Sequence, residues 1–262
     1  MTQATITRPR HLTMRAWRWE RRKTSLLPVA ATAALFGLLG ALSGCWNYQY
    51  NQEIYAEQQM TWEAVLINGV QLPAMVFLPA GLAMFAAVDA ARAQKARSWQ
   101  RARSLDRAGV LLRAQVLRNL ERAVVTALVF SSMIIGAIVV MGFGQDLLAD
   151  DGLAVIVGRT LASVPCYWAV GSVITAAGLW IREFSGLAAA GLLGSILAMA
   201  IRVVVPGLSW LMPFALPVNA MVAKGGDELF SFLDMAGWAG IGLAWVIALY
   251  GVARRRAARM EA

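Results

Sequence analysis

The stretch GLSWLMPFALPVNAMV, from Gly207 to Val222, decides how often this chain crosses a membrane. It is apolar, but it is shorter than the roughly 20 residues that a helix needs to cross the hydrocarbon core. Pro213 and Pro217 interrupt it. Each proline lacks the backbone N–H that would donate a hydrogen bond, and lipid cannot replace that bond. We therefore predict that residues 206–229 form a re-entrant or interfacial hairpin on the outer side of the membrane, rather than a seventh span.

The composition of the whole chain is that of a membrane protein. Of its 262 residues, 59% are hydrophobic and 15% are charged, a balance that excludes an ordinary soluble domain. We predict an all-α polytopic membrane protein with one transmembrane domain over residues 1–262. Its six spans are predicted at Leu26–Gly44, Val65–Val88, Ala123–Phe143, Thr160–Ile181, Phe184–Val205 and Phe230–Tyr250. Spans one and two thus fall within 26–88, spans three to five within 123–205, and span six at 230–250.

Basic residues set the predicted orientation, because cytoplasmic loops collect Lys and Arg. With six spans and a cytoplasmic N-terminus, 21 of the 24 Lys and Arg residues fall on the cytoplasmic side. The exceptions are Arg159, Arg202 and Lys224. A seventh span would place the basic C-terminal tail, 251–262, outside. Both termini are therefore predicted to be cytoplasmic. The net charge of +9 follows from this topology, and no nucleic-acid partner is needed to explain it.

The stretch LSGC, which ends at Cys45, offers an alternative start to the mature chain. A small residue pair before a cysteine, with an apolar run upstream, is the pattern of a bacterial lipoprotein cleavage site, and cleavage there would leave five spans. The basic region ahead of the run is longer than in a typical signal peptide. The other interpretation is a small-residue helix end, in which Gly40 and Gly44 allow close helix packing. We favour this second interpretation, with the first span retained.

The first 25 residues are basic, with Met14, Trp17 and Trp19 between the arginines. This composition is typical of a helix that lies at the level of the lipid headgroups. An ordinary positively charged anchor for the first span would have the same composition, so both interpretations stay open for residues 1–25.

The segment 89–122 is too long for a simple turn between spans and too short for a domain. Apolar residues recur at three- and four-residue steps from Ala102 onward, which predicts a helix that continues into the third span, with Ser104 as a start signal. Ahead of it, residues 94–104 are expected to form a short surface element that carries Trp99 among arginines. That composition is common in protein contacts. The alternative is a solvated basic linker whose Trp99 rests in the membrane interface.

The spans lack the residues that intramembrane chemistry needs. Their interiors contain no paired carboxylates and no histidine, and we expect Asp89, Arg159, Glu183 and Arg202 to reach the interface from span ends. The lone His11 and two cysteines predict no metal site. No P-loop motif is present, so the chain is not expected to bind ATP itself. We therefore predict no catalytic site in this chain.

Several short motifs occur in one order along the chain. Trp62 opens the second span and Pro73 and Pro79 follow it, Asp89 ends that span, and Ser98-Trp99 and Ser104 with Arg107 come next. In this layout the chain resembles the membrane subunits of type-2 ABC exporters, in particular the permeases of lantibiotic-immunity and antimicrobial-peptide-export systems. Asp89 departs from the family's more usual Glu, and the outer PGLSWLMPFALP stretch matches the family only loosely.

The resemblance implies a half-transporter in the bacterial cytoplasmic membrane. It would pair with itself or a sister permease and with two P-loop ATPase subunits, which would bind ATP and Mg while this chain binds no cofactor. An amphipathic peptide or drug would be exported, for self-immunity or resistance. The implied ATPase-coupling surface consists of Arg97, Ser98, Trp99, Arg101, Arg103, Ser104, Asp106 and Arg107. Asp89 would be the acid at the cytoplasmic end of the second span. The outer hairpin or gate would contain Trp210, Pro213 and Pro217. The competing hypothesis is a non-transporting scaffold or sensor that holds a cytoplasmic partner.

Overall fold

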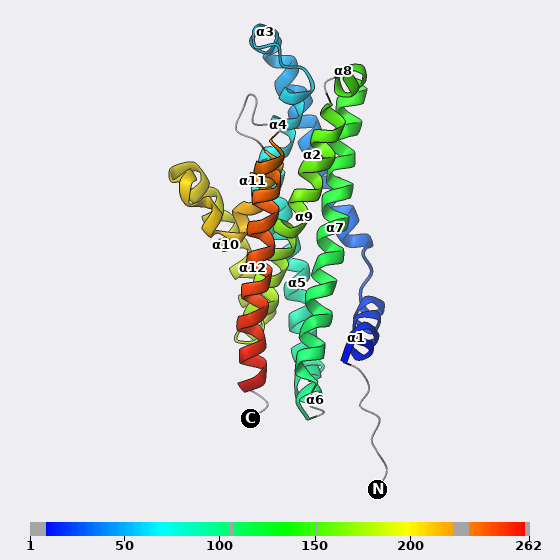
Figure 1. The fold of residues 1–262 in the computed structure, drawn as a ribbon, viewed down its shortest axis with the longest axis vertical. Helices are drawn as coiled ribbons and strands as arrows, with labels where there is room; N and C mark the ends of the chain where they lie inside the picture. Colours follow the sequence, from blue (N-terminus) through cyan, green and yellow to red (C-terminus); the bar gives the residue numbers. More distant parts are fainter. Residues whose placement is uncertain (1–8, 105–106, 150, 223–230, 260–262) are drawn as a thin grey trace.

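A computed structural model describes residues 9–104, 107–149, 151–222 and 231–259, and within these ranges the chain is helical with no strand. Figure 1 shows the helices as an elongated bundle. In chain order the elements are α1 (Pro9–Lys23), α2 (Leu27–Tyr50), α3 (Gln52–Glu57), α4 (Trp62–Leu72), the π turn η1 (Pro73–Phe77), α5 (Leu78–Lys95), α6 (Ser98–Ser104), α7 (Ala108–Val140), α8 (Gly144–Ala149), α9 (Gly152–Ala177), α10 (Phe184–Val204), the 3₁₀ turns η2 (Pro206–Leu211) and η3 (Pro213–Ala215), α11 (Leu216–Met221) and α12 (Phe232–Arg259).

The prediction of six spans is confirmed by helix length and composition. Six helical stretches in the described part of the chain are long and apolar enough to cross a membrane. Several are longer than predicted: α2 continues to Tyr50, and α12 continues to Arg259. Hydropathy marks only the part of a helix that is apolar, whereas backbone hydrogen bonding carries the helix on into polar sequence.

The second span is one continuous helical stretch, Trp62–Lys95, with the π turn η1 inside it. This wider turn lies directly ahead of Pro79. The ring of a proline collides with the carbonyl four residues earlier, here that of Met75, and a π turn relieves the collision. The prolines therefore lie within this span without ending it.

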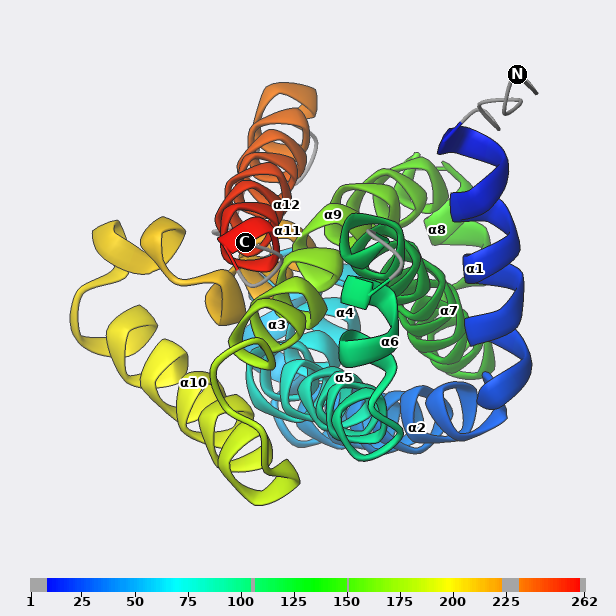
Figure 2. The same ribbon diagram turned by 90° about the horizontal axis from the view of Figure 1, so that it is seen from below.

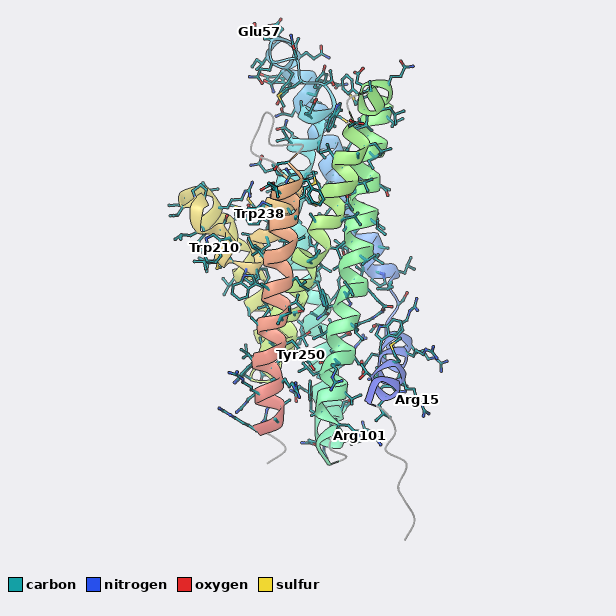
Figure 3. The ribbon with its side chains drawn as sticks, in the orientation of Figure 1. Arg15, Glu57, Arg101, Trp210, Trp238 and Tyr250 are labelled. Atoms are coloured by element: carbon teal, nitrogen blue, oxygen red, sulfur yellow. The ribbon has the colours of Figure 1, made fainter. Side chains whose placement is uncertain are left out.

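Both ends of the described chain lie at one end of the bundle. The helices α1 and α6 and the C-terminal end of α12 are at the bottom of Figure 1, and α3 and α8 are at the top. We call the first the basic end and the second the acidic end. In Figure 3, Arg15 and Arg101 lie at the basic end and Glu57 lies at the acidic end. This separation of charge agrees with the charge pattern of the sequence.

The helix α9 lies in the middle of the bundle and packs against α5, α7, α11 and α12. Seen along the bundle in Figure 2, α10 lies at the periphery and α1 runs across the outside of α7. The predicted hairpin at 206–229 is, as far as residue 222, a series of short helical turns, and its remainder lies outside the described residues. Pro213 and Pro217 begin new turns there, where a missing backbone donor costs little.

Glycines bring α2 and α4 into backbone contact, as expected for a small-residue helix end. A Cβ on Gly40 would lie 2.2 Å from the carbonyl oxygen of Gly69, and a Cβ on Gly44 would lie 2.5 Å from that of Val65. Between apolar helices in lipid, close packing of this kind supplies much of the attraction. The first two spans therefore associate through their backbones.

Replacing Gly40 with Ala is expected to destabilise the bundle by about 1–3 kcal/mol or more, because the added methyl would push α2 away from α4. Gly136→Ala is the matched control, since a Cβ at this position in α7 would meet nothing within 4 Å. The melting temperature of each variant is measured by thermal unfolding in detergent. Equal melting temperatures for the two would contradict the backbone contact.

Candidate functional site

The short helix α6 is attached to the bundle by the side chain of Trp99. A turn with Arg97 in the left-handed region, at φ 51°, separates α6 from α5. Trp99 is only 3% exposed. It belongs to an apolar cluster at the basic end with Ala93, Ala108, Leu112, Ala176, Leu179, Ala253 and Ala257. One side chain of α6 thus contacts a cluster built from α5, α7, α12 and the end of α9.

This burial corrects the expectation that Trp99 is part of an exposed contact surface. The alanines contributed by neighbouring helices leave room for an indole, and burial of the ring is more favourable than its exposure to water. Of the other predicted surface residues, Arg97, Arg101 and Arg107 are exposed and Ser98 is half-buried. Asp106 and the side chains of Arg103 and Ser104 lie outside the described residues.

The expected helix into the third span exists, but it begins later than predicted. Ser104 is the last residue of α6 and not the start signal of the next helix. The long helix α7 begins at Ala108, with Arg107 in the N-cap position and no side-chain cap. From there α7 runs without a break to Val140, so α6 and the third span are joined through residues 105–107.

A buried ion pair joins α5 to α7 above α6. Asp89 accepts a hydrogen bond from Arg122 at 2.6 Å, and the Arg122 side chain is only 4% exposed. Arg122 also lies 3.4 Å from the Asn119 side-chain oxygen, and Asn119 donates to the hydroxyl of Thr175 in α9 at 2.7 Å. Asp89 is therefore paired with Arg122 in the bundle, and its own side chain is 14% exposed.

The helix α1 is held against α7 by charged contacts. Arg118, 1% exposed, pairs with Glu121 and donates to the backbone oxygen of Thr24, just after α1. Arg21 lies 3.4 Å from the same Glu121 carboxylate. These contacts fix the crosswise position of α1 seen in Figure 2.

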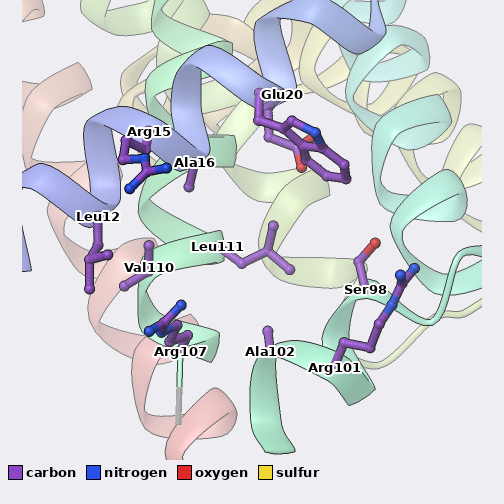
Figure 4. A pocket seen from close by; sticks show the side chains of 11 residues that line it. Leu12, Arg15, Ala16, Glu20, Ser98, Arg101, Ala102, Arg107, Val110 and Leu111 are labelled. Carbon is purple, nitrogen blue, oxygen red and sulfur yellow. The ribbon is translucent and has the colours of Figure 1, made fainter. Parts of the chain in front are cut away.

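A groove of about 440 Å³ opens between α1, α6 and α7. Figure 4 shows side chains from the three helices facing this space. Its apolar lining includes Leu12, Ala16, Trp19, Ala102, Val110 and Leu111, and its cationic lining consists of Arg15, Arg101 and Arg107. The predicted coupling residues Ser98, Arg101 and Arg107 therefore share one groove with α1, which the sequence did not indicate.

The predicted outer residues lie on the turns between α10 and α12. Trp210 in η2 is 48% exposed, whereas Pro213 and Pro217 are buried. The backbone oxygen of Trp210 accepts a hydrogen bond from Trp245 of α12 at 3.3 Å, and Asn219 donates to Ser209 at 2.9 Å. This segment is therefore fastened to α12 and folded on itself.

Arg159 was expected to reach the interface, and that expectation is wrong. Its side chain is 2% exposed, pairs with Asp234 at 2.7 Å, and donates to the backbone oxygen of Ala220 at 3.3 Å. The ring nitrogen of Trp238 donates to the same carboxylate at 2.8 Å. Helix α9 is thus tied to both α11 and α12. The i,i+4 spacing of Asp234 and Trp238 is a sequence signal for an oriented carboxylate, but nothing local identifies its arginine.

Metal binding has no support among the described residues, where no group of three or more His, Cys, Asp or Glu side chains lies together. Comparison of the chain with family profiles, characterised proteins and solved structures finds no match. The geometry of α6 and of the groove beside it is therefore the feature of the chain that bears most on function.

Changing Asp89 to Ala is expected to cost about 3–5 kcal/mol of stability, because it leaves the buried charge of Arg122 without its partner. Replacing both residues, with Asp89→Leu and Arg122→Met, should recover most of that loss, since no buried charge remains. Unfolding in detergent with increasing denaturant compares the two. A double variant as unstable as the single one would contradict a role for the ion pair in compensating Arg122.

Proposed function

We propose that this chain is the membrane subunit of a type-2 ABC exporter in a bacterial cytoplasmic membrane. Two such subunits, identical or related, would act with two P-loop ATPase subunits that bind ATP and Mg. The substrate would be an amphipathic antimicrobial peptide or drug, and the role self-immunity or resistance. Six membrane-crossing helices and the short helix α6 at the basic end support this proposal.

The observation that carries the proposal is the attachment of α6 through Trp99. A membrane subunit that is driven by a separate ATPase needs a surface element whose displacement is passed on to its spans. The exposed arginines of α6 and its flanks provide such a surface, and Trp99 joins it to the ends of α5, α7, α12 and α9. Because packed interiors transmit displacement, a push on α6 would move several spans together.

Orientation and the remaining elements fit the same proposal. The positive-inside rule places the basic end in the cytoplasm, on the side of the ATPases. The crosswise helix α1, with its arginines and tryptophans, would lie at the headgroup level. The turns η2 and η3 and helix α11 would dip into the outer leaflet and, fastened by Arg159 and Asp234, would form the outer gate.

A scaffold or sensor that only holds a cytoplasmic partner is the second candidate. The deep burial of Trp99 favours the exporter over it, because a passive holder needs contact residues on its surface but no link from that surface into the spans.

Replacing Trp99 with Ala is expected to lower ATP-driven export by about tenfold or more, because loss of a buried indole leaves a cavity worth about 3–5 kcal/mol between α6 and the spans. Trp99→Phe should keep most of the transport. Trp46→Ala is the matched control, since Trp46 is 73% exposed in α2. The measurement is uptake of a fluorescent cationic peptide by inverted vesicles, with the co-purified ATPase quantified. Full transport by the Trp99→Ala variant would refute coupling through Trp99, and a chain that never co-purifies with an ATPase would refute the exporter.

The intact mass of the same preparation tests the alternative at Cys45. We expect a chain that retains α2, because Gly40 and Gly44, on the N-terminal side of Cys45, hold this helix against α4. A chain that begins at a diacylated Cys45 would show that the first span is a signal peptide.

A further inference from the structure

A second groove at the basic end opens between α1, α7 and α12, and we call it the Tyr250 groove. Its volume is about 490 Å³. Figure 3 shows Tyr250 on the part of α12 that leads to the basic end. The described residues that line the groove are Thr13 of α1, Arg113, Val116 and Leu117 of α7, and Tyr250 and Arg254 of α12. Two cationic side chains from different helices thus share one groove with apolar and aromatic ones.

The two arginines of the Tyr250 groove have no acidic partner in the described part of the chain. No carboxylate is among the described lining residues, and no described residue forms an ion pair with Arg113 or Arg254. The Nε of Arg113 is buried and has no hydrogen-bond partner among the described residues. By contrast, Arg118, Arg122 and Arg159 each pair with a carboxylate. Like charges beside one cavity repel each other, so the groove favours an anion between them.

The Tyr250 groove lies at the depth of the lipid headgroups. On α12, Arg254 follows Tyr250, where the predicted sixth span ends, by four residues, a rise of about 6 Å. On α7, Leu117 precedes Arg122, just before the predicted third span, by five residues, or about 8 Å. Headgroup regions extend about 5–8 Å beyond each side of the hydrocarbon core. This depth agrees with the headgroup level proposed for α1, because α1 contributes Thr13 to the groove.

Apolar surface continues from the Tyr250 groove toward the membrane. Helix α9 lies between α7 and α12 in Figure 2, and its half-buried Trp168 donates to the backbone oxygen of Val116 at 2.8 Å. Further along, α7 exposes Leu128, and α12 exposes Leu243 and Ile247. A soluble anion would leave the apolar lining without a contact, whereas a phospholipid has both a charged group and acyl chains. The groove therefore fits a lipid better than a free ion.

We infer that the Tyr250 groove binds the phosphate of an anionic phospholipid between Arg254 and Arg113. Basic pockets between membrane helices on the cytoplasmic side bind such headgroups. Tyr250 suits this position, since its ring meets lipid while its hydroxyl meets water. Arg113 lies one turn beyond Leu117 and would contact the phosphate from the cytoplasmic side. The lipid would join α1, α7 and α12 at the basic end. The inference goes beyond the proposed function and holds for an exporter and a scaffold alike.

Native mass spectrometry of the full chain in detergent tests this inference through the dissociation constant of the first bound lipid. The probes are dioleoyl phosphatidylglycerol and dioleoyl phosphatidylcholine, which have the same acyl chains and differ in net charge. The parent chain should bind phosphatidylglycerol about tenfold more tightly or better, because two arginines face the phosphate.

The arginines of the groove have a matched control. Arg254→Gln and Arg113→Gln should each weaken phosphatidylglycerol binding about fivefold, the loss expected for one cation near an anionic headgroup. Arg255→Gln should leave it unchanged, because Arg255 is exposed on the same turn of α12 but does not line the groove. All three variants should bind phosphatidylcholine as the parent does, which also shows that the bundle remains folded.

Three results would overturn the inference. Equal losses for Arg254→Gln and Arg255→Gln would show that only the general charge of the basic end attracts the lipid. Equal affinity of the parent chain for the two lipids would show that the headgroup charge has no role. Displacement of phosphatidylglycerol by inorganic phosphate at millimolar concentration would assign the groove to a soluble anion. None of these results bears on ATP-driven export, which the Trp99 variants test separately.

Discussion

The side chains of Arg118, Arg122 and Arg159 are almost completely buried, and the arrangement of the bundle depends on how each charge is compensated. A guanidinium inside a membrane protein is costly unless ion pairs and hydrogen bonds replace its water. Each of these arginines finds partners on elements distant in sequence: Asp89 of α5 for Arg122, the backbone after α1 for Arg118, and α11 and α12 for Arg159. Compensation of charge therefore selects which helices are neighbours, a choice that apolar contacts alone leave open.

Through such contacts α7 and α9 form the firmly joined part of the bundle, whereas α10 is joined to it more loosely. Along α7 and α9, hydrogen bonds link Asn119 to Thr175, Thr160 to Ser131, and Trp168 to the Val116 backbone. Helix α10 packs mainly on α5 and presents large apolar side chains such as Leu193 and Leu197 outward. Since α6 is attached at the base of the joined part, a displacement there would shift α5, α7 and α9 together, and rearrangement would fall on the contacts of α10.

Sequence reasoning predicted the spans well, because hydropathy is a local property and six apolar stretches of sufficient length are unambiguous. It failed where burial depends on other helices. Trp99 stands among arginines in a short connecting segment, and the apolar cluster that buries it includes residues of distant helices, such as Ala176 and Ala253. Arg159 is followed by its carboxylate partner 75 residues later, a pairing that no spacing rule indicates. Gly40 was interpreted correctly, because small residues spaced along one helix are a local pattern that indicates close packing.

The two ends of the molecule are held together by different interactions, and this difference bears on how the proposed export would be driven. At the basic end, an apolar anchor and exposed arginines lie on one short helix, so a partner that bound the charges would displace the anchor in the same movement. At the acidic end, Arg159 joins α9 to the turns that precede α12, and Asp234 is shared with Trp238. A shift of α9 driven from α6 would therefore pull directly on the Ala220 backbone. The outer segment would respond to the basic end through α9, because both attachments lie on α9 or on its immediate contacts.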